Sequence, residues 1–295
     1  MDAVDLKIFA AVARTGAMNR AAAELHTVQS NVTAHVRLLE TELGMALFDR
    51  HSRGVTLTTA GRRLLPYATR IGQLMVEARL AVADEGEPGG PLTIGSLETT
   101  AAIRLPKVLA TYSKAHPAVD LVLATGTTAE LVGDVLERRR EGAFVCGPVD
   151  HPELEEEVIF REDLVVVTAR PLHSLADLGR TGDLKIVVLR IGCSYRQRLE
   201  ALLARRGIVG LRRLEFGTIE GLMGCVAAGI GLTLLPKSLV AAAAAEGRVA
   251  VHDLPAAEGQ VSTVFIRRRD SFVSSALAAF LQCARPETAR SAAAE

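Results

Sequence analysis

The sequence predicts two folded parts, an all-α N-terminal domain that includes a short hairpin and a longer C-terminal α/β domain. Apolar residues recur at helical spacing in the first part, and a Gly- and Pro-rich segment at 85–91 (EGEPGGP) interrupts that pattern. Beyond it, short apolar runs typical of strands alternate with helical patterns. The chain has 295 residues, 49% of them hydrophobic, which is enough for such cores.

The segment from Thr27 to Gly44 is the central helix of the N-terminal domain. Thr27 is its expected N-cap, and Gly44 is the residue just past its end. Its apolar residues share one stripe, which we expect to be buried: Val28, Val32, Val36, Leu39 and Leu43. The opposite face carries short hydrogen-bonding side chains and one cation: Gln29, Ser30, Thr33 and Arg37.

Two shorter helices precede it. Val4 to Thr15 has one apolar face and ends at Gly16, and Met18 to Leu25 is an Ala-rich helix separated from the central one by only His26 and Thr27. Two helices so joined form a helix-turn-helix, whose second helix can enter a DNA major groove. Gln and Arg make paired hydrogen bonds to base edges there. The alternative from the pattern alone is a helix pair that only packs.

A hairpin follows the central helix. Phe48 to Leu57 has a glycine turn between two short extended runs, which suits a two-stranded wing. Its tip carries Arg50, His51, Ser52 and Arg53, which would meet phosphates or a minor groove, although an ordinary solvated hairpin is the alternative. Basic and acidic residues number 34 each, so local cations such as Arg20 must attract DNA.

The last N-terminal element is a long helix from Thr58 or Thr59 to about Ala83. Pro66 lies inside it, so we expect a kink between Arg62 and Pro66, or a helix that restarts there. Apolar residues repeat at alternating spacings of four and three, the seam of a coiled coil that needs a partner helix: Leu64, Ala68, Ile71, Met75, Ala78 and Val82.

From Asp5 to Gly61 the chain resembles the N-terminal domain of the LysR-type transcriptional regulators. The resemblance rests on RAAAELHTVQ, LETELGMALFDR and VTLTTAG. It implies a sequence-specific regulator that dimerises through the long helix and reads an interrupted inverted repeat in double-stranded DNA. Two residues depart from the family pattern. Ala17 replaces a capping Ser, whose role we expect Asn19 to take, and Ala34 replaces a long polar residue.

The C-terminal domain has eight predicted strands: Leu92–Gly95, Val119–Ala124, Ala143–Gly147, Leu164–Thr168, Ile186–Leu189, Leu214–Phe216, Leu232–Leu235 and Val261–Ile266. The segments LTIGSLETTAAIRLP and GCVAAGIGLTLLP resemble the LysR effector domain. This resemblance implies two Rossmann-like lobes, as in periplasmic binding proteins, with crossovers near Leu164–Thr168 and Val264–Arg268.

The predicted boundaries follow from these elements. Residues 1–58 form the winged helix-turn-helix, 59–87 the linker helix and hinge, and 88–295 the effector domain. Within the last, lobe I covers about 91–163 and 268–285, and lobe II about 164–267. The tail 286–295 has too few apolar residues to pack and is predicted to be disordered.

Several strand-to-helix junctions carry small and hydroxyl-bearing residues. Ligands of open α/β sheets bind at the carboxyl ends of strands, where helix N-termini favour anions such as a carboxylate. The predicted effector site is Ser96, Thr99, Thr100, Thr127, Thr128, Gly147, Cys193, Ser194, Tyr195, Gly217 and Thr218. The alternative is that each junction is only an N-cap.

Two further residues bear on this site. Glu98 would repel an anion unless it points away or pairs with an amine, so an amino-bearing or neutral ligand stays open. Cys193 is expected to be an exposed thiol whose pKa the helix N-terminus lowers, which makes redox sensing an alternative to ligand binding. Regulation without any effector is the remaining alternative.

The motifs exclude catalysis. The seven histidines have no metal-binding spacing, the four cysteines form no C-x-x-C pair, and no G-x-S-x-G, P-loop or G-x-G-x-x-G motif opens a βαβ unit. The sequence therefore predicts no metal, no cofactor and no enzyme activity. A solute-binding protein is the alternative of another class, but the helix-turn-helix and the lack of a secretory signal disfavour it.

The expected partners follow from the resemblance. They are double-stranded DNA, a small-molecule effector such as a carboxylate or amino acid, a second copy or three further copies of the chain, and RNA polymerase. No run approaches the roughly 18 apolar residues of a membrane span. We therefore expect a cytoplasmic protein without membrane contact.

Overall fold

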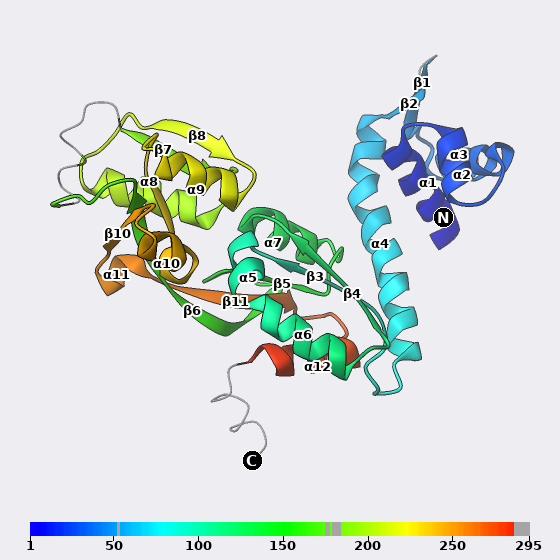
Figure 1. The fold of residues 1–295 in the computed structure, drawn as a ribbon. Helices are drawn as coiled ribbons and strands as arrows, with labels where there is room; N and C mark the ends of the chain where they lie inside the picture. The colour runs from blue at the N-terminus through cyan, green and yellow to red at the C-terminus, as the bar shows by residue number, and fades with distance from the viewer. Residues whose placement is uncertain (52–53, 175–177, 179–183, 286–295) are drawn as a thin grey trace. The chain divides into compact units, whose positions relative to one another are not determined.

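The computed structural model describes residues 1–51, 54–174, 178 and 184–285. The chain divides into two compact units, Met1–Asp84 and Glu85–Glu295. The first unit contains, in order, α1 (Ala3–Thr15), α2 (Met18–Glu24), α3 (Gln29–Leu43), β1 (Phe48–His51), β2 (Gly54–Leu57) and α4 (Thr59–Ala83), as Figure 1 shows. The predicted helices and the two-stranded wing are thus confirmed.

The core of this unit lies between α1, α3 and α4. Phe9 of α1 is fully buried and packs against Phe48 of the wing, with ring centroids 5.2 Å apart. The buried carboxylate of Asp5 meets His35 Nδ1 at 2.8 Å, which ties α1 to α3 through a polar contact. Apolar burial and this one bond therefore fix the helix whose other face stays in solvent.

The predicted buried stripe of α3 holds in its middle and fails at its ends. Val32, Val36 and Leu39 are fully buried. Val28 is 63% exposed because it is itself the N-cap, one residue beyond the expected Thr27, and precedes the first helical turn. Leu43 is also exposed, at the last turn. The predictions that Thr27 caps the helix and that Val28 is buried are wrong.

The cap of α2 also differs from the expected one. Its N-cap is Ala17, without a side-chain hydrogen bond, and the helix begins at Met18 without loss of length. Asn19 does not replace the missing cap, because its Oδ1 accepts only from the neighbouring Arg20 N at 2.9 Å. The first N–H groups of α2 therefore lack the side-chain acceptor that a Ser at position 17 would offer.

Backbone groups of the wing and of the residue before it contact the helices and the α1–α2 turn. Val55 N donates to Gly16 O at 3.0 Å, and a Cβ at Gly54 would lie 2.5 Å from that same oxygen. Glu40 of α3 accepts from Leu47 N and Phe48 N at 2.8 and 3.2 Å. The close approach at Gly54, whose φ is +137°, requires a residue without a side chain.

The long helix α4 begins at the cap Thr58, whose side chain accepts from Gly61 N, and continues through Pro66. The predicted restart at Pro66 therefore does not occur. The seam divides in two. Leu64, Ala68 and Ile71 pack against the core of their own unit, whereas the later seam residues are exposed: Met75, Ala78 and Val82.

The second unit alternates strands with helices. Its elements are β3 (Gly90–Ser96), α5 (Glu98–Ile103), α6 (Leu105–Ala115), β4 (Val119–Thr125), α7 (Thr128–Leu136), β5 (Gly142–Cys146), β6 (Leu154–Thr168), β7 (Lys185–Leu189), α8 (Ser194–Arg205), β8 (Arg212–Phe216), α9 (Ile219–Ala227), β9 (Thr233–Pro236), α10 (Lys237–Ala245), β10 (Ala250–Asp253), α11 (Ala256–Gly259), β11 (Gln260–Arg268) and α12 (Ser275–Ala284). The eight predicted strands are present; β10 was not predicted.

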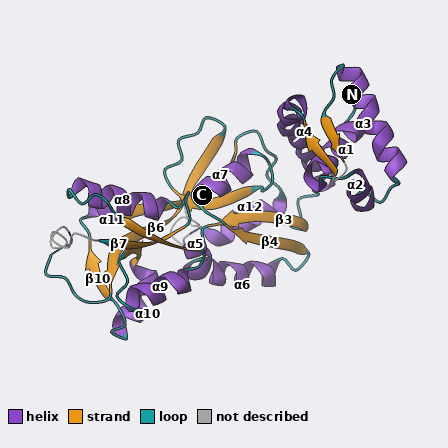
Figure 2. Ribbon diagram, turned by 90° about the horizontal axis from the view of Figure 1, so that it is seen from above, coloured by secondary structure: helices purple, strands orange, loops and turns teal. Residues whose placement is uncertain are grey.

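These elements form two lobes, which we call lobe I (β3–β5, α5–α7 and α12) and lobe II (β7–β10 and α8–α11). In lobe I, β3 pairs in parallel with β4 and β5, and Figures 1 and 2 show α7 on one face of this sheet and α6 on the other. In lobe II, β7 pairs in parallel with β8. The two long strands β6 and β11 pair with each other and join the lobes.

Both crossovers lie earlier in the chain than predicted. The end of β6, residues 164–168, pairs with β9 and β10 and already belongs to lobe II. Residues 263–266 of β11 pair with β5 and already belong to lobe I. The crossing segments alternate buried and exposed residues, so their apolar content is lower than that of the buried strand ends that the sequence reveals.

Each lobe has an apolar core, and a third apolar cluster is shared between them. Aromatic side chains fill lobe I, where Tyr112 donates a hydrogen bond to Ala276 O at 2.8 Å and Phe144 lies 5.0 Å from Phe265. The shared cluster joins Val145 of lobe I to Leu199 and Leu232 of lobe II. In the part of the chain that the structure describes, no helix combines the length and apolar character that a bilayer crossing requires.

Candidate functional site

The solvent face of α3 carries the residues that the sequence assigns to DNA. Gln29, Ser30 and Arg37 are exposed, and none of them takes part in the packing of the unit. The Thr33 hydroxyl is half-buried and donates to Gln29 O at 2.9 Å, so only its acceptor capacity is left for a base. The four side chains therefore form one polar strip suited to a major groove.

Sequence reasoning missed the residues beside this strip. Val28 was assigned to the core, but it is exposed at the start of α3, where its methyl groups could contact a thymine methyl. Asn31 is exposed as well, with its Nδ2 donating to Thr27 Oγ1 at 3.1 Å.

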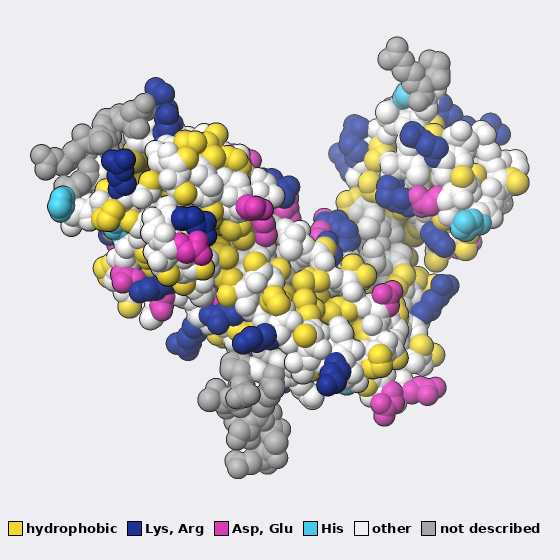
Figure 3. All heavy atoms as spheres, in the orientation of Figure 1, with side chains coloured by type: hydrophobic (Ala, Val, Ile, Leu, Met, Phe, Trp, Pro, Cys, Tyr) yellow, Lys and Arg dark blue, Asp and Glu magenta, His cyan; other side chains and the backbone are white. Residues whose placement is uncertain are grey.

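The basic residues around the helix pair differ in whether an acidic side chain lies nearby. Arg20 is exposed, and Arg50 on the wing is exposed but lies 3.4 Å from the Glu40 carboxylate. Arg53, also predicted to bind DNA, lies outside the described residues, as does the tail 286–295 that is predicted to be disordered. Figure 3 shows dark blue Lys and Arg side chains spread over the visible face of this unit.

A cavity of about 230 Å³ lies between the two lobes of the second unit. It opens at the carboxyl ends of parallel strands from both lobes, the position where open α/β sheets bind ligands. Its lining consists of Leu97, Glu98, Thr99, Thr125, Gly126, Thr127, Thr128, Cys146, Leu189, Arg190, Cys193, Ser194, Tyr195, Phe216, Gly217 and Thr218.

The cavity gathers most of the residues that the sequence assigns to an effector. Eight of them line it: Thr99, Thr127, Thr128, Cys193, Ser194, Tyr195, Gly217 and Thr218. Ser96 and Thr100 are buried beside it but are not part of the lining, and Ser96 Oγ donates to Leu97 O at 3.0 Å. Gly147 lines a different cavity, of about 380 Å³.

The lining residues that the sequence did not assign carry the apolar wall and one charge. Leu97, Leu189 and Phe216 supply apolar surface, Thr125 a hydroxyl and Cys146 a thiol, and Arg190 brings a guanidinium. Each comes at or within a residue of a strand end, which is the signal that would have found it. Most of them carry neither the hydroxyl groups nor the glycines that characterise the predicted junctions.

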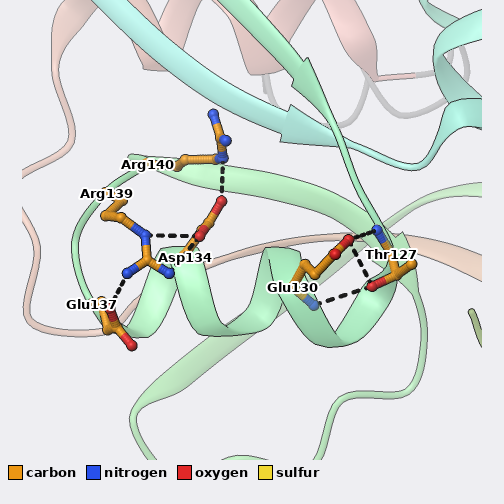
Figure 4. Close-up of polar contacts among 6 residues, drawn as sticks. All are labelled: Thr127, Glu130, Asp134, Glu137, Arg139 and Arg140. Carbon is orange, nitrogen blue, oxygen red and sulfur yellow. Dashed lines mark hydrogen bonds and ion pairs between the residues drawn. The ribbon is translucent and has the colours of Figure 1, made fainter. Parts of the chain in front are cut away.

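Two of the hydroxyls are N-caps, as the alternative reading proposed. Thr127 and Glu130 form a capping box at the start of α7, with Thr127 N donating to Glu130 Oε2 at 2.8 Å and Glu130 N to Thr127 Oγ1 at 3.3 Å (Figure 4). Thr218 Oγ1 accepts from Gly221 N at 3.3 Å at the start of α9. These two hydroxyls therefore serve their helices first.

Ion pairs brace the other end of α7. The two oxygens of Asp134 each accept one hydrogen bond of 2.8 Å, from Arg139 Nε and Arg140 Nε, and Arg139 also meets Glu137 (Figure 4). The turn between α7 and β5 is thereby tied back to the helix. Polar contacts thus hold both ends of α7, whose first residue, Thr128, lines the cavity.

Thr99 differs from the capping residues. It lines the cavity, is 3% exposed, and its Oγ1 has no hydrogen-bond partner among the described residues. The Tyr195 hydroxyl is close enough for Thr99 to lower its pKa, but the two oxygens do not have the geometry of a hydrogen bond. A buried hydroxyl without a partner costs free energy, which a polar ligand atom would recover.

Three hydrogen bonds cross the cavity between the lobes. Glu98 Oε1 of lobe I accepts from Ile219 N at 3.1 Å, at the start of α9 in lobe II. Ser194 Oγ donates to Thr128 Oγ1 at 2.9 Å, and Ala129 N lies 3.5 Å from Gly192 O. Glu98 thus does not point away from the site but occupies the N-terminus of α9 itself.

The thiols of the cavity contradict the expectation for Cys193. Cys193 is 7% exposed, and burial raises the pKa of its thiol more than the neighbouring backbone N–H groups lower it. Cys146, 5% exposed, lines the same cavity from lobe I, and burial raises its pKa as well. Both thiols are held neutral, which disfavours the redox alternative.

Metal binding finds no support in the side-chain arrangement. Across the described ranges, no three His, Cys, Asp or Glu side chains converge as the ligands of an ion would. The charged groups that line the cavity are instead one carboxylate, Glu98, and one guanidinium, Arg190. The arrangement can hold a small organic molecule through hydroxyls, two charges and an apolar wall.

Known proteins share both units. Residues 4–62 match the model of the bacterial regulatory helix-turn-helix protein, lysR family, and residues 85–289 match the LysR substrate binding domain. The HTH-type transcriptional regulator GltR of Bacillus subtilis (strain 168) is 42% identical over 94% of this chain and 93% of its own. The regulator CzcR of Bacillus anthracis is 41% identical over 96% of each chain.

Solved structures show the same likeness. Full-length CbnR in complex with its target DNA has a TM-score of 0.66 and 26% identity, covering 96% of this chain and 99% of CbnR. ArgP from Mycobacterium tuberculosis has a TM-score of 0.68 at 20% identity, covering 97% of this chain and 96% of its own, which shows the shared fold alone. The relatives are transcriptional regulators, a class that is not catalytic. The chain belongs to the LysR family of DNA-binding transcriptional regulators.

Proposed function

We propose that a small molecule bound between the lobes controls how this regulator engages DNA. The observation that carries the proposal is the cavity, because both lobes line it and three hydrogen bonds cross it. A ligand that contacts both lobes binds the closed arrangement more tightly than an open one and so shifts the population toward closure. A carboxylate or an amino acid suits its hydroxyls and charges.

Ligand binding in the cavity would act on DNA binding through the oligomer. We propose a homodimer or homotetramer in which the α4 helices of two chains pair along the seam Leu64, Ala68, Ile71, Met75, Ala78 and Val82. The exposure of the later seam residues supports this, since Val82 is 89% exposed in the single chain. Two winged domains so joined would read the halves of an interrupted inverted repeat in the cytoplasm.

Residue roles at the DNA follow from the exposed strip and the surrounding cations. We propose that Gln29, Ser30, Thr33 and Arg37 contact bases, and that Arg20, Arg50 and Arg53 contact phosphates. Closure of the lobes would change the arrangement of the oligomer, and with it the bend of the DNA and the surface offered to RNA polymerase.

The test is a footprint and a bend-angle measurement on the full-length protein at its own promoter DNA, with and without saturating small molecules. The molecules are chosen by thermal shift from a panel of carboxylates and amino acids. We expect a ligand that raises the melting temperature to alter the length of the footprint or the bend. A ligand that binds with saturation yet leaves both unchanged contradicts gating.

A further inference from the structure

The cavity between the lobes carries two opposite charges, one from each lobe. Glu98 is the first residue of α5 in lobe I, and Arg190 follows β7 in lobe II. The remaining lining is uncharged, because burial holds Cys146, Cys193 and Tyr195 in their neutral forms by raising the pKa of each. A ligand therefore meets one carboxylate and one guanidinium in a lining that is otherwise made of hydroxyl, thiol and apolar groups.

Glu98 retains capacity for a donor. Its Oε1 accepts from Ile219 N at 3.1 Å, and its Oε2 has no hydrogen-bond partner among the described residues. The side chain is half-buried, so a donor that reached it would bind in surroundings less polar than water. An ammonium group, with three N–H donors and a full charge, fits that oxygen.

Arg190 is also uncommitted. Within the described part of the chain, its guanidinium has neither a hydrogen bond nor an ion pair. The pKa of Glu130 is lowered first by hydrogen bonds from Thr127 and only to a lesser degree by the positive charge of Arg190, so Glu130 is already engaged in its helix cap. The guanidinium can bind a ligand carboxylate with two parallel hydrogen bonds.

The middle of the cavity limits the rest of the ligand. Its volume of about 230 Å³ lies below the range of about 300 to 1,000 Å³ that drug-sized molecules require. Leu97, Leu189 and Phe216 offer apolar contact. Thr99 offers the one buried hydroxyl oxygen in the described lining that lacks a partner. A short uncharged side chain matches these surfaces.

We infer that the cavity selects a small α-amino acid in its zwitterionic form, with the ammonium on Glu98 and the carboxylate on Arg190. Since Glu98 and Arg190 stand on different lobes, such a ligand joins the lobes through the two charged groups on its α-carbon. A ligand with a carboxylate but no amine leaves Glu98 without a cationic partner. A ligand with an amine but no carboxylate leaves Arg190 without an anionic partner. This inference rests on the proposed function of the cavity as the effector site.

The experiment measures ligand affinity of the full-length protein by thermal shift and titration calorimetry. The probes are the standard L-amino acids and, for valine and leucine, the acids that lack the amine (isovalerate and 4-methylvalerate) and the amines that lack the carboxylate (isobutylamine and isoamylamine). We expect at least one uncharged-side-chain amino acid to bind about 10- to 100-fold more tightly than its acid or amine, as loss of a charged hydrogen bond implies.

Variants assign the two ends. Glu98→Gln keeps an oxygen acceptor for Ile219 N but removes the charge, so it should weaken amino acid binding by about 10-fold or more and leave binding of the acid unchanged or stronger. Arg190→Gln should weaken binding of the amino acid and leave binding of the amine unchanged or stronger. Arg190→Lys should restore part of the affinity for the amino acid. Glu220→Gln, on the exposed second residue of α9 and outside the lining, is the control and should bind like the wild type.

Other outcomes overturn the inference. Equal affinity for the amino acid and its acid or amine contradicts it, as does unchanged binding in Glu98→Gln and Arg190→Gln, or silence across every amino acid. The two levels of the hypothesis fail separately. An amino acid that binds without altering the DNA footprint leaves the inference standing and contradicts gating, whereas a ligand of another class that alters the footprint does the reverse.

Discussion

Burial decides the chemistry of the cavity thiols. Cys193 lies at the N-cap of α8, where nearby N–H groups favour a thiolate, yet the loss of solvent disfavours the charge more strongly. Position along a helix is visible in a sequence, whereas the depth at which that helix end is buried is not. This is why the expectation of a low pKa was reasonable for Cys193 and is nevertheless wrong.

The raised thiol pKa values predict slow alkylation. With the pKa above its ordinary range, the reactive thiolate of Cys146 and Cys193 is scarcer at neutral pH than in an exposed cysteine, and its fraction grows only as the pH rises toward the raised pKa. Iodoacetamide labelling followed by peptide mass spectrometry should show both reacting more slowly than the half-buried Cys225 and Cys283. Urea-unfolded protein should lose the difference; rapid labelling of folded Cys193 would contradict the account.

Gly54 lies where the wing approaches the α1–α2 turn, and we expect its replacement to lower the stability of the N-terminal unit. Gly54→Ala places a methyl 2.5 Å from Gly16 O at a φ of +137°, and we expect it to destabilise the N-terminal unit by about 1 to 3 kcal/mol. Urea denaturation measures the loss. Gly72→Ala adds the same methyl where nothing lies within 4 Å and should not destabilise. Equal effects of the two would refute steric contact as the cause.

Elements were predictable where their periodicity was long and one-sided. The stripe of α3 and the buried ends of the strands follow from residue type alone, because a core accepts only apolar side chains there. The crossing segments were not predictable in position, since β6 and β11 pair with each other in a register that no local pattern encodes. Arg190 and Cys146 lie at or next to strand ends, so their positions in the sequence could have indicated that they line the cavity.

Substitutions in and near α3 should distinguish contacts to bases from contacts to phosphates. If Gln29 and Arg37 touch bases, substituting either by Ala should weaken specific DNA binding by about 1 to 3 kcal/mol and leave non-specific DNA nearly unchanged. Arg20→Ala should instead weaken both by similar factors and reduce the salt dependence. Fluorescence anisotropy with promoter and scrambled duplexes measures each.

Arg14→Ala supplies the reference for that series, because Arg14 pairs with Glu24 and lies outside α3. It should leave both kinds of binding near the wild-type value. Equal losses on specific and non-specific DNA for Gln29→Ala and Arg37→Ala would show that the strip does not read sequence.

The seam of α4 predicts the oligomeric behaviour of charge substitutions. Met75 and Val82 are exposed in the single chain and apolar, and burial of each against a partner helix would contribute about 1.5 to 3 kcal/mol. Met75→Lys or Val82→Lys should therefore raise the dimer dissociation constant about 10- to 100-fold in analytical ultracentrifugation. Val76→Lys, also exposed but off the seam, is the matched control; loss of the dimer in all three would contradict the register.

At the scale of the molecule, closure of the lobes depends on small contacts across the cavity. A Cβ on Gly192 would meet Thr127 Oγ1 of the other lobe at 2.8 Å, so Gly192→Ala should hold the lobes apart. Hydrogen exchange should then be faster at Ile219 N, which donates to Glu98 across the cavity. Gly210→Ala, with a similar positive φ but nothing within 4 Å, separates backbone strain from contact. Unchanged exchange at Ile219 in the Gly192 variant would contradict this account of closure.

The two paired strands between the lobes affect how such a regulator can evolve by recombination. The chain enters lobe II once, along β6, and leaves it once, along β11, and these strands are antiparallel neighbours. Lobe II is thus an insertion into lobe I with both joints side by side. A recombination event that exchanges the segment between the joints replaces one wall of the cavity, Arg190 included, and leaves Glu98, α4 and the DNA-reading helix in place. Under the proposed function, a lineage would in this way acquire a new ligand while it keeps its old promoter.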